Sequence, residues 1–212
     1  IFSSFDQYLF NGPVSFIFED LAHRMGLVGT AFYDLMMVAY MSYFLLPIYG
    51  GILYFRMLDN ENKFKVGRLF FSVLLYFGLN FILYLIVPVT GPQYWMRDIY
   101  HAQLPLSSFG HFLWGVVNNG QTTFIDCFPS GHTGIAFLVS MWLFRINHTH
   151  RFFLLGVTTL IVMATLAMRY HYTLDLLCAF PLAYFCHRAA WFFIPVDIRP
   201  QYLRGEILAT KP

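Results

Sequence analysis

The chain has 212 residues, of which 58% are hydrophobic, 20% are aromatic and 11% are charged, and its formal net charge is +2. A soluble domain carries about a quarter charged residues, so this composition excludes an ordinary water-soluble protein and indicates an integral membrane protein. A net charge this small gives no reason to expect nucleic acid as a partner. The three cysteines do not predict a disulfide framework.

The first 27 residues are predicted to form an amphipathic segment at the membrane interface. Residues 1–25 combine many Phe and Leu residues with charged ones such as Glu19 and Arg24, and an Asn-Gly-Pro sequence at residues 11–13 breaks the run. Short helices of this mixed character lie along a headgroup surface instead of crossing it. Because the sequence begins at Ile1 and not at Met, a further segment is expected upstream.

Four or five apolar stretches follow that are predicted to span the membrane as helices. They are residues 28–55, 69–88, 132–144, 152–168 and 172–195, of which the third is short. Pro47 and the Gly50-Gly51 pair are expected to kink the first stretch. The expected fold class is therefore all-α: a polytopic membrane helical bundle with five spans in this chain and a sixth upstream. Residues 28–195 would form one transmembrane domain, and residues 196–212 would form a cytoplasmic tail.

Lysine and arginine are distributed unevenly between the two sides that these spans create. Ten fall on one side and three on the other, and such an excess marks the cytoplasmic side of a membrane. The C-terminus is therefore expected in the cytoplasm, and the loops with fewer basic residues are expected in the periplasm or a lumen. The larger group comprises Arg56, Lys63, Lys65, Arg68, Arg145, Arg151, Arg188, Arg199, Arg204 and Lys211, and the smaller group comprises Arg24, Arg97 and Arg169.

His171 and Asp175, at the start of the last apolar stretch, have the chemistry of a nucleophile and its orienting group. At a spacing of i to i+4 they would share one face of a helix, where the carboxylate can accept a hydrogen bond from the imidazole. That contact fixes the tautomer and makes the other ring nitrogen more nucleophilic. A helix-end pair without a function has the same spacing, so the pair alone leaves both interpretations open.

The sequence Pro-Ser-Gly-His at residues 129–132 opens the third apolar stretch. Pro and Gly allow a tight turn into a helix, whose N-terminal N–H groups and dipole suit a phosphoryl group. Ser130 and Gly131 would then bind the phosphate, and His132 in the first turn would act as a general acid or base. The alternative is an ordinary Ser-Gly helix cap beside a structural histidine.

Together, Pro-Ser-Gly-His at 129–132 and His-Tyr-Thr-Leu-Asp at 171–175 resemble motifs of the type 2 phosphatidic acid phosphatase (PAP2) superfamily of membrane phosphatases and phosphotransferases. Their order, spacing and membrane side agree with that family over about residues 28–195. The resemblance implies a bundle of six helices with its site at the outer membrane face. It also implies that His171 attacks phosphorus to form a phosphohistidine, that Asp175 orients it, and that His132 transfers the protons. No metal and no other cofactor are expected.

The chain departs from the PAP2 pattern where the family has basic residues. The first family motif, Lys-x6-Arg-Pro, is degraded, because Gln93 stands where an arginine is natural. Thr165 likewise replaces the arginine that precedes the nucleophile. Arg169 and Arg97 are the predicted replacements in phosphate binding, and Gln93 itself is a further candidate phosphate-binding residue. The segment 171–175, following Ser-Gly-His-Thr, also resembles the sphingomyelin and inositol-phosphorylceramide synthase branch, which transfers lipid headgroups and lacks the same arginine.

Two acidic residues are candidates for supporting roles. Asp126, beside the turn, would position His132 or a substrate hydroxyl. Asp34, early in the first apolar stretch, would support a catalytic residue through a contact on the side away from the substrate, or would simply lie at the membrane interface.

Three functions fit these residues. With water as the acceptor the protein would be a lipid phosphate phosphatase, and with a lipid hydroxyl it would be a headgroup or phosphosphingolipid transferase. The third is a catalytically silent relative that acts as a membrane structural or interaction subunit. The degraded first motif favours this last interpretation, whereas the intact Ser130, His132, His171 and Asp175 argue against it. The expected partners are a lipid phosphate substrate and membrane lipids.

Overall fold

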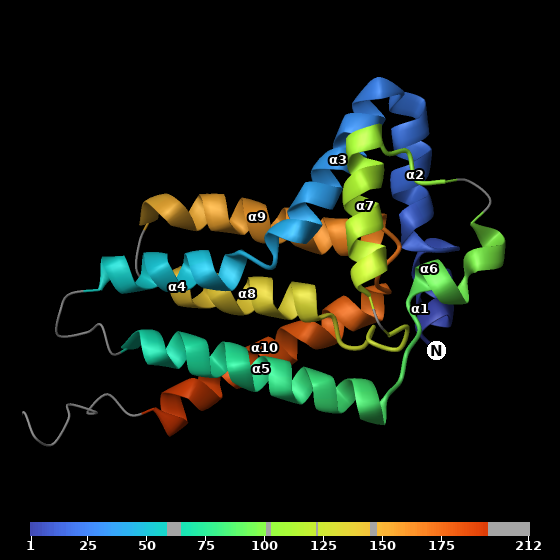
Figure 1. Ribbon diagram of the computed structural model, residues 1–212. Coiled ribbons are helices and arrows are strands. Elements are labelled where there is room, and N and C mark those ends of the chain that lie inside the picture. Colours follow the sequence, from blue (N-terminus) through green and yellow to red (C-terminus); the bar gives the residue numbers. More distant parts are fainter. Residues whose placement is uncertain (59–64, 101–102, 122, 145–147, 195–212) are drawn as a thin grey trace, which may run out of the picture.

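The computed structural model describes residues 1–58, 65–100, 103–121, 123–144 and 148–194 (Figure 1). Within these residues the regular structure is helical, apart from one isolated bridge between Val89 and Asp126. The all-α prediction is thus confirmed. The predicted tail and five of the basic residues used to predict the orientation lie outside the described residues: Lys63, Arg145, Arg199, Arg204 and Lys211.

Five helices lie side by side and form the body of the molecule (Figure 1). They are α4 (Leu46–Met57), α5 (Val66–Ile86), α8 (Gly131–Leu143), α9 (His148–Ala167) and α10 (Thr173–Phe193). α8 packs against each of the other four, and its Ile135, Leu138 and Trp142 are buried. A Cβ atom at Gly134 would collide with the Tyr76 side chain, so glycine allows α5 to approach α8 here. Close approach at small residues is how helices associate within a membrane.

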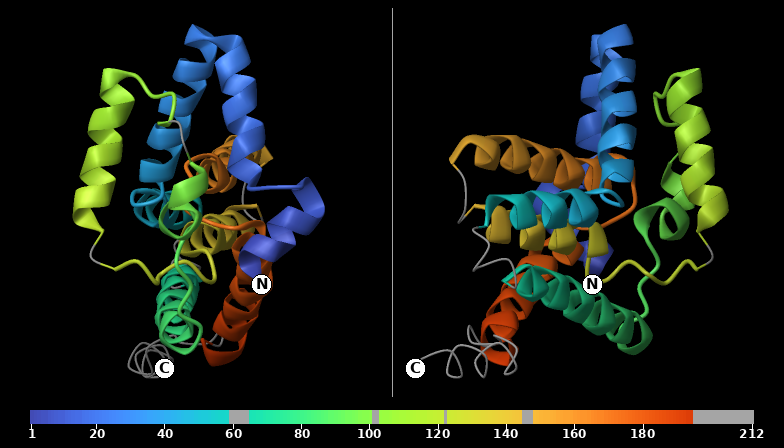
Figure 2. Two further views of the ribbon diagram at one scale, coloured as in Figure 1. Left: turned by 90° about the vertical axis from the view of Figure 1, so that its right-hand side faces the viewer. Right: turned by 60° about the vertical axis from the view of Figure 1, so that its left-hand side comes forward.

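Three further helices stand across one end of this body (Figures 1 and 2). They are α2 (Val14–Met25), α3 (Leu27–Ser42) and α7 (Ser108–Gly120), and α3 packs against α2, α7 and α9. Gly26 joins α2 to α3 with a φ of 56°, a left-handed conformation that favours glycine. The short elements α1 (Phe2–Phe10), α6 (Pro92–Trp95) and η2 (Arg97–Ile99) lie at the same end of the body.

The first predicted span consists of two helices instead of one. α3 and α4 are separated by a turn at residues 43–45 and are bent by 63° relative to each other. Pro47, at the start of α4, has no N–H group to donate to the preceding turn, which accounts for a break at this point. The kink predicted near Pro47 is thus a full break, and the predicted stretch 28–55 is formed by two helices.

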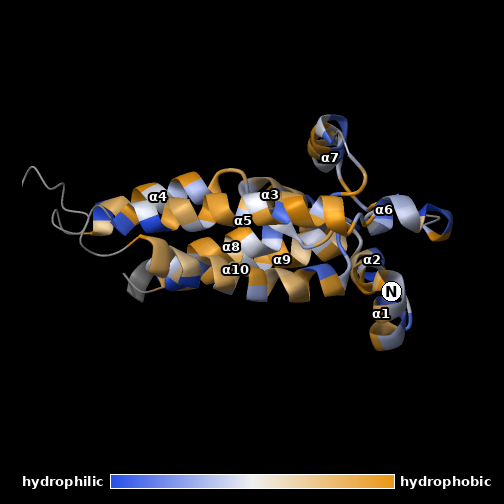
Figure 3. Cartoon of the chain, turned by 90° about the horizontal axis from the view of Figure 1, so that it is seen from below, coloured by the Kyte–Doolittle hydropathy of each residue, from blue (hydrophilic) through white to orange (hydrophobic). Residues whose placement is uncertain are grey.

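Two of the described helices, α5 and α10, are long and apolar enough to cross a membrane, and the bent α3–α4 pair would make a third span. α8 and Arg151–Ala167 are apolar but shorter. The 13 residues of α8 rise only about 20 Å, whereas the hydrocarbon core of a bilayer is about 30 Å thick. The structure therefore has a helix at each of the five predicted stretches, and the number of spans stays a prediction. Hydrophobic residues predominate along the helices of the body (Figure 3). Many of their side chains are exposed, among them Ile48, Ile52, Phe70, Leu74, Leu177 and Phe185.

The helix directions bring the two sequence motifs to the same end of the body. The C-terminal ends of α5 and α9 meet the N-terminal ends of α8 and α10 there, beside α2, α3 and α7 (Figure 1). The opposite helix ends carry the described basic residues of the larger group: Arg56, Lys65, Arg68, Arg151 and Arg188.

Candidate active site

His171 and Asp175 are brought together by the turn between α9 and α10. The backbone N–H groups of Tyr170 and His171 both donate to the carbonyl of Thr165, at 3.1 Å each, which closes the end of α9. Tyr172 is the N-cap of α10, and its N–H group donates to Asp175 Oδ2 at 2.8 Å. His171 Nδ1 then lies 3.5 Å from the same oxygen. Both side chains are buried, Asp175 completely.

This contact differs from the one that the spacing predicted. His171 lies before the N-cap, so the two residues do not share a helix face, and the expected i to i+4 helical geometry is wrong. They meet because the Asp175 carboxylate turns back to cap the first turn of α10, where a negative charge is stabilised by the helix dipole. The histidine nitrogen that faces Asp175 is Nδ1, so Nε2 is left for chemistry.

The Pro-Ser-Gly-His turn is hydrogen-bonded to α10 and to α5. The N–H group of Ser130 donates to the main-chain carbonyl of Asp175 at 3.2 Å, and the Tyr76 hydroxyl donates to the carbonyl of Ser130 at 3.0 Å. Ser130 is the N-cap of α8: its hydroxyl donates to the Thr133 side chain at 3.1 Å and accepts the Thr133 N–H at 3.3 Å. The predicted donation from this hydroxyl to phosphate would therefore replace its bond to Thr133. The N–H groups of Gly131 and His132 have no hydrogen-bond partner among the described residues.

The His132 ring is held between two tyrosine rings. Its centroid lies 4.1 Å from that of Tyr40 and 4.0 Å from that of Tyr43. The ring centroid of His171 is 6.2 Å away. His132 Nε2 is buried and has no hydrogen-bond partner among the described residues, which costs about 1–3 kcal/mol if nothing else binds there. A buried His132 Nε2 without a partner, close to a second histidine, is suited to exchange a proton with a bound ligand.

Both histidines line a small polar cavity of about 70 Å³. Asp126 also lines it and accepts a hydrogen bond from Gln121 Nε2 at 3.3 Å, and its role in positioning His132 or a hydroxyl stays a prediction. The side-chain oxygen of Gln121, Oε1, in turn accepts hydrogen bonds from the Tyr94 hydroxyl at 2.9 Å and from Gln93 Nε2 at 3.4 Å. The remaining lining residues are Tyr40, Tyr84, Gly91, Cys127 and Tyr170.

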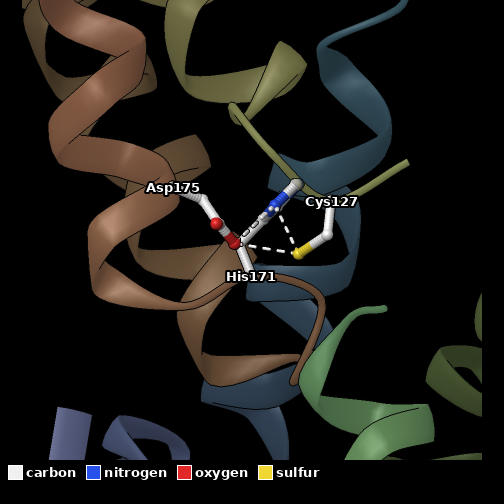
Figure 4. Close-up of side chains that lie close together, drawn as sticks. All are labelled: Cys127, His171 and Asp175. Atoms are coloured by element: carbon white, nitrogen blue, oxygen red, sulfur yellow. Dashed lines mark hydrogen bonds and ion pairs between the residues drawn. The ribbon is translucent and has the colours of Figure 1, made fainter. Parts of the chain in front are cut away.

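Cys127 contacts both members of the histidine–aspartate pair (Figure 4). Its thiol donates to Asp175 Oδ2 at 2.8 Å, and its sulfur lies 3.5 Å from His171 Nδ1. Burial, together with the negative charge of Asp175, raises the pKa of the Cys127 thiol well above its ordinary value, so at neutral pH the group is a neutral donor.

The two predicted arginines are placed differently from each other. Arg169 makes a bidentate ion pair with Glu19 of α2, with Nε 2.8 Å from Oε1 and Nη2 2.7 Å from Oε2. Its guanidinium also stacks 4.1 Å over the ring of Tyr100. Arg97, in η2, is exposed and lines a neighbouring cavity of about 320 Å³ together with Gln93 and Arg169. Much of the positive charge of Arg169 is therefore already balanced by a carboxylate.

The Glu19–Arg169 ion pair is expected to stabilise the fold. Each side chain is only 10% exposed, and Arg169 has a φ of 64°, which is unfavourable for any residue except glycine. Arg169→Ala or Glu19→Ala leaves one charge buried and unpaired, so each should lower the free energy of unfolding by about 3–5 kcal/mol. The double replacement should cost less than the sum of the two. Thermal unfolding in detergent measures all three.

The exposed pair Asp20 and Arg24, whose side chains are 63% and 75% exposed, is the matched control, and its removal should change stability by less than about 1 kcal/mol. If Arg169→Ala instead lowered kcat/KM and left thermal unfolding unchanged, the predicted phosphate-binding role would hold and the structural role would fail.

Asp34 does not join the histidines. It accepts hydrogen bonds from the N–H group and the hydroxyl of Ser107, the N-cap of α7. Asp34 lies six residues before Tyr40 on α3, which corresponds to about 9 Å along the helix. Its observed contacts tie α7 to α3, and the prediction that it contacts the catalytic groups finds no geometric support.

Four residues at the site have contacts that the sequence does not reveal. Glu19 belongs to the predicted interfacial segment, and no local pattern connects it with a residue 150 positions later. Tyr40 and Tyr43 look like ordinary membrane aromatics in the sequence. Cys127, two residues before Pro129, has only its position beside the motif as a signal in the sequence.

Comparisons with known proteins bear on the family and the fold of the chain. A family model described as the PAP2 superfamily matches residues 15–189. The chain is similar to a PA-phosphatase related-family protein of Dictyostelium discoideum, with 26% identity over 144 residues, 66% of this chain and 25% of that protein. The chain thus spans about a quarter of the length of this relative. Its fold resembles the crystal structure of Aquifex aeolicus LpxE, with a TM-score of 0.56, 18% identity, and coverage of 84% of this chain and 93% of that one.

At 18% identity the likeness to the solved structure shows the fold alone. The family match is broader evidence, because it covers most of the chain and contains both motifs, which the fold brings to one cavity. The resemblance found in the sequence is confirmed: the chain belongs to the PAP2 superfamily.

Proposed function

We propose that the protein is a membrane lipid phosphate phosphatase that works through a phosphohistidine. Membership of the PAP2 superfamily supports a phosphatase-type activity. The observation that carries the proposal is that His171 and His132 line one small cavity, with Asp175 against Nδ1 of His171 and Nε2 of His132 unpartnered. A cavity of about 70 Å³ suits a phosphoryl group better than a whole lipid, whose remainder would extend outwards.

In this mechanism His171 Nε2 attacks the phosphorus, and the bond from phosphorus to the lipid oxygen breaks. His132 gives a proton to the departing alkoxide and later takes one from water. The water oxygen attacks the phosphorus, the phosphorus–nitrogen bond breaks, and phosphate is released while His171 Nε2 regains its electron pair. The N–H groups of Gly131 and His132 at the start of α8 would stabilise charge on the equatorial oxygens. The hydroxyls of the cavity tyrosines and the exposed Arg97 are further donors.

One observation favours headgroup transfer as a second candidate function. Glu19 balances Arg169, and Asp126 adds a carboxylate to the cavity wall, so the site is poor in positive charge. Such a site tolerates the single charge of a phosphodiester better than the two charges of a phosphomonoester. A phosphodiester substrate with a lipid hydroxyl as acceptor would make the protein a transferase with the same catalytic residues.

A substrate panel tests the proposal. Purified protein would be incubated with phosphatidic acid, a polyprenyl diphosphate and phosphatidylglycerol phosphate, and separately with a phosphodiester lipid and a lipid alcohol. Release of inorganic phosphate is the expected result. Exchange of headgroups without phosphate release would contradict the phosphatase proposal and support headgroup transfer. If the protein does neither, it is a catalytically silent relative.

We propose further that the site faces the periplasm or a lumen and that the C-terminus is cytoplasmic. The described basic residues at the helix ends remote from the site support this orientation. Cysteines placed at Asn119 should then react with an impermeant thiol reagent in intact cells, whereas cysteines placed at Arg56 should react only after permeabilisation. Both positions are exposed, so accessibility within the protein is matched. The reverse pattern would contradict the orientation.

A further inference from the structure

Cys127, His171 and Asp175 form a cluster of three potential metal ligands, which we call the thiol–imidazole–carboxylate cluster (Figure 4). One ligand atom from each lies within 4.8 Å of the other two. The measured separations are 3.5 Å from Sγ to Nδ1, 2.8 Å from Sγ to Oδ2 and 3.5 Å from Nδ1 to Oδ2. The second carboxylate oxygen, Asp175 Oδ1, is buried and has no hydrogen-bond partner among the described residues.

These separations are close to those that a tetrahedral zinc ion requires. With Zn–S of about 2.3 Å and Zn–N and Zn–O of about 2.0–2.1 Å, the ligand atoms lie about 3.3–3.6 Å apart. Two of the three edges of the cluster already have this length, and the edge from Cys127 to Asp175 has to lengthen by about 0.7 Å. Sulfur and imidazole nitrogen select zinc over the hard cations Mg²⁺ and Ca²⁺.

The cavity beside the cluster offers a place for a fourth ligand. Cys127 and His171 line the cavity of about 70 Å³, which connects the cluster with the proposed phosphate position. Three protein ligands with an open fourth position are a common arrangement for zinc, and water or a phosphate oxygen would fill that position. The unpartnered Asp175 Oδ1 would gain a metal contact if the carboxylate rotated or bound through both oxygens.

We propose that this cluster is an inhibitory zinc site built around the nucleophile, an inference that rests on the proposed function for its effect on activity. Binding releases the thiol proton of Cys127 to solvent and joins zinc to Nδ1 of His171. A neutral imidazole carries one proton, so zinc on Nδ1 places that proton on Nε2. The atom that has to attack phosphorus then has no free electron pair, and Asp175 is held by the metal. Zinc therefore stops the reaction without touching His132.

Metal binding itself can be measured without a substrate. Co²⁺ replaces Zn²⁺ in such sites and gives a thiolate-to-cobalt charge-transfer band when cysteine is a ligand. Purified wild-type protein in detergent should bind Co²⁺ with this band and lose it when Zn²⁺ is added. Cys127→Ala should not show the band, whereas Cys186→Ala should, because Cys186 is equally buried but lies 11 residues beyond Asp175 on α10, about 16 Å away. A band that survives in Cys127→Ala, or its absence from the wild type, overturns the site.

Inhibition is the second measurement. Zn²⁺ should stop turnover of the substrate identified by the panel, and the same concentration of Mg²⁺ should not. Relative to each variant's own uninhibited rate, Cys127→Ala and Cys127→Ser should require at least about 10-fold more Zn²⁺, since loss of a direct ligand weakens a site at least as much as loss of a supporting contact. Thermal unfolding of both variants shows whether they fold. Activation by Zn²⁺, or equal inhibition of all variants, contradicts the proposal. A protein without any activity would refute the proposed function and leave the cobalt measurement to decide the metal site.

Discussion

Replacement of His171 by alanine is expected to abolish turnover. The variant has no nitrogen to attack phosphorus, so no covalent intermediate can form. Asp175→Asn should reduce kcat by several orders of magnitude, roughly 10⁴-fold if the effect resembles that of the corresponding change in a Ser-His-Asp triad. Steady-state rates with the substrate that releases most phosphate measure both effects.

The Asp175→Asn variant should fold, because an amide oxygen can still accept the N–H group of Tyr172 that caps α10. Equal thermal unfolding of wild type and variant is therefore the control for this prediction. If Asp175→Asn retained full activity, the carboxylate would be a helix cap and no more.

His132→Ala is expected to slow the release of lipid alcohols by about 10²–10⁴-fold, since no group then protonates the leaving oxygen. An aryl phosphate has a leaving group that needs no proton, so its first step should be affected far less. Single-turnover rates with the two kinds of substrate measure the difference.

Loss of the imidazole also leaves a gap between Tyr40 and Tyr43, whose rings lie about 4 Å from His132 on either side. His132→Phe retains an aromatic ring there and should show the same substrate dependence as His132→Ala. If either variant lost activity toward both substrates equally, His132 would act in binding or packing instead of proton transfer.

The amino-acid sequence predicted what depends on local chemistry. The apolar stretches predicted the helices of the body, and the two short motifs identified the two histidines that line the small cavity. Gly131 and Ser130 begin α8 as expected, because turn residues and caps act within a few positions of the chain.

Contacts between distant segments could not be read in the same way. The break between α3 and α4 turns α3 across the end of the body, which places Tyr40 against His132. Glu19 reaches Arg169 only because α2 folds back beside α3 and α9. Arg169, which was expected to bind phosphate, is thus paired with a carboxylate, and no spacing in the sequence indicates this contact. Asp175 was predicted correctly as a neighbour of His171, but through a helix face and not through the cap that the structure has.

The most direct test of a phosphohistidine at His171 is to trap it. His132→Ala, mixed briefly with a labelled aryl phosphate, should accumulate an acid-labile label, because the nucleophile is present and no general base activates water. Mass spectrometry of the digested protein should place the phosphate on His171, and the double variant with His171→Ala should remain unlabelled. A label on another residue, or turnover with no label in His132→Ala at any time, would contradict the mechanism.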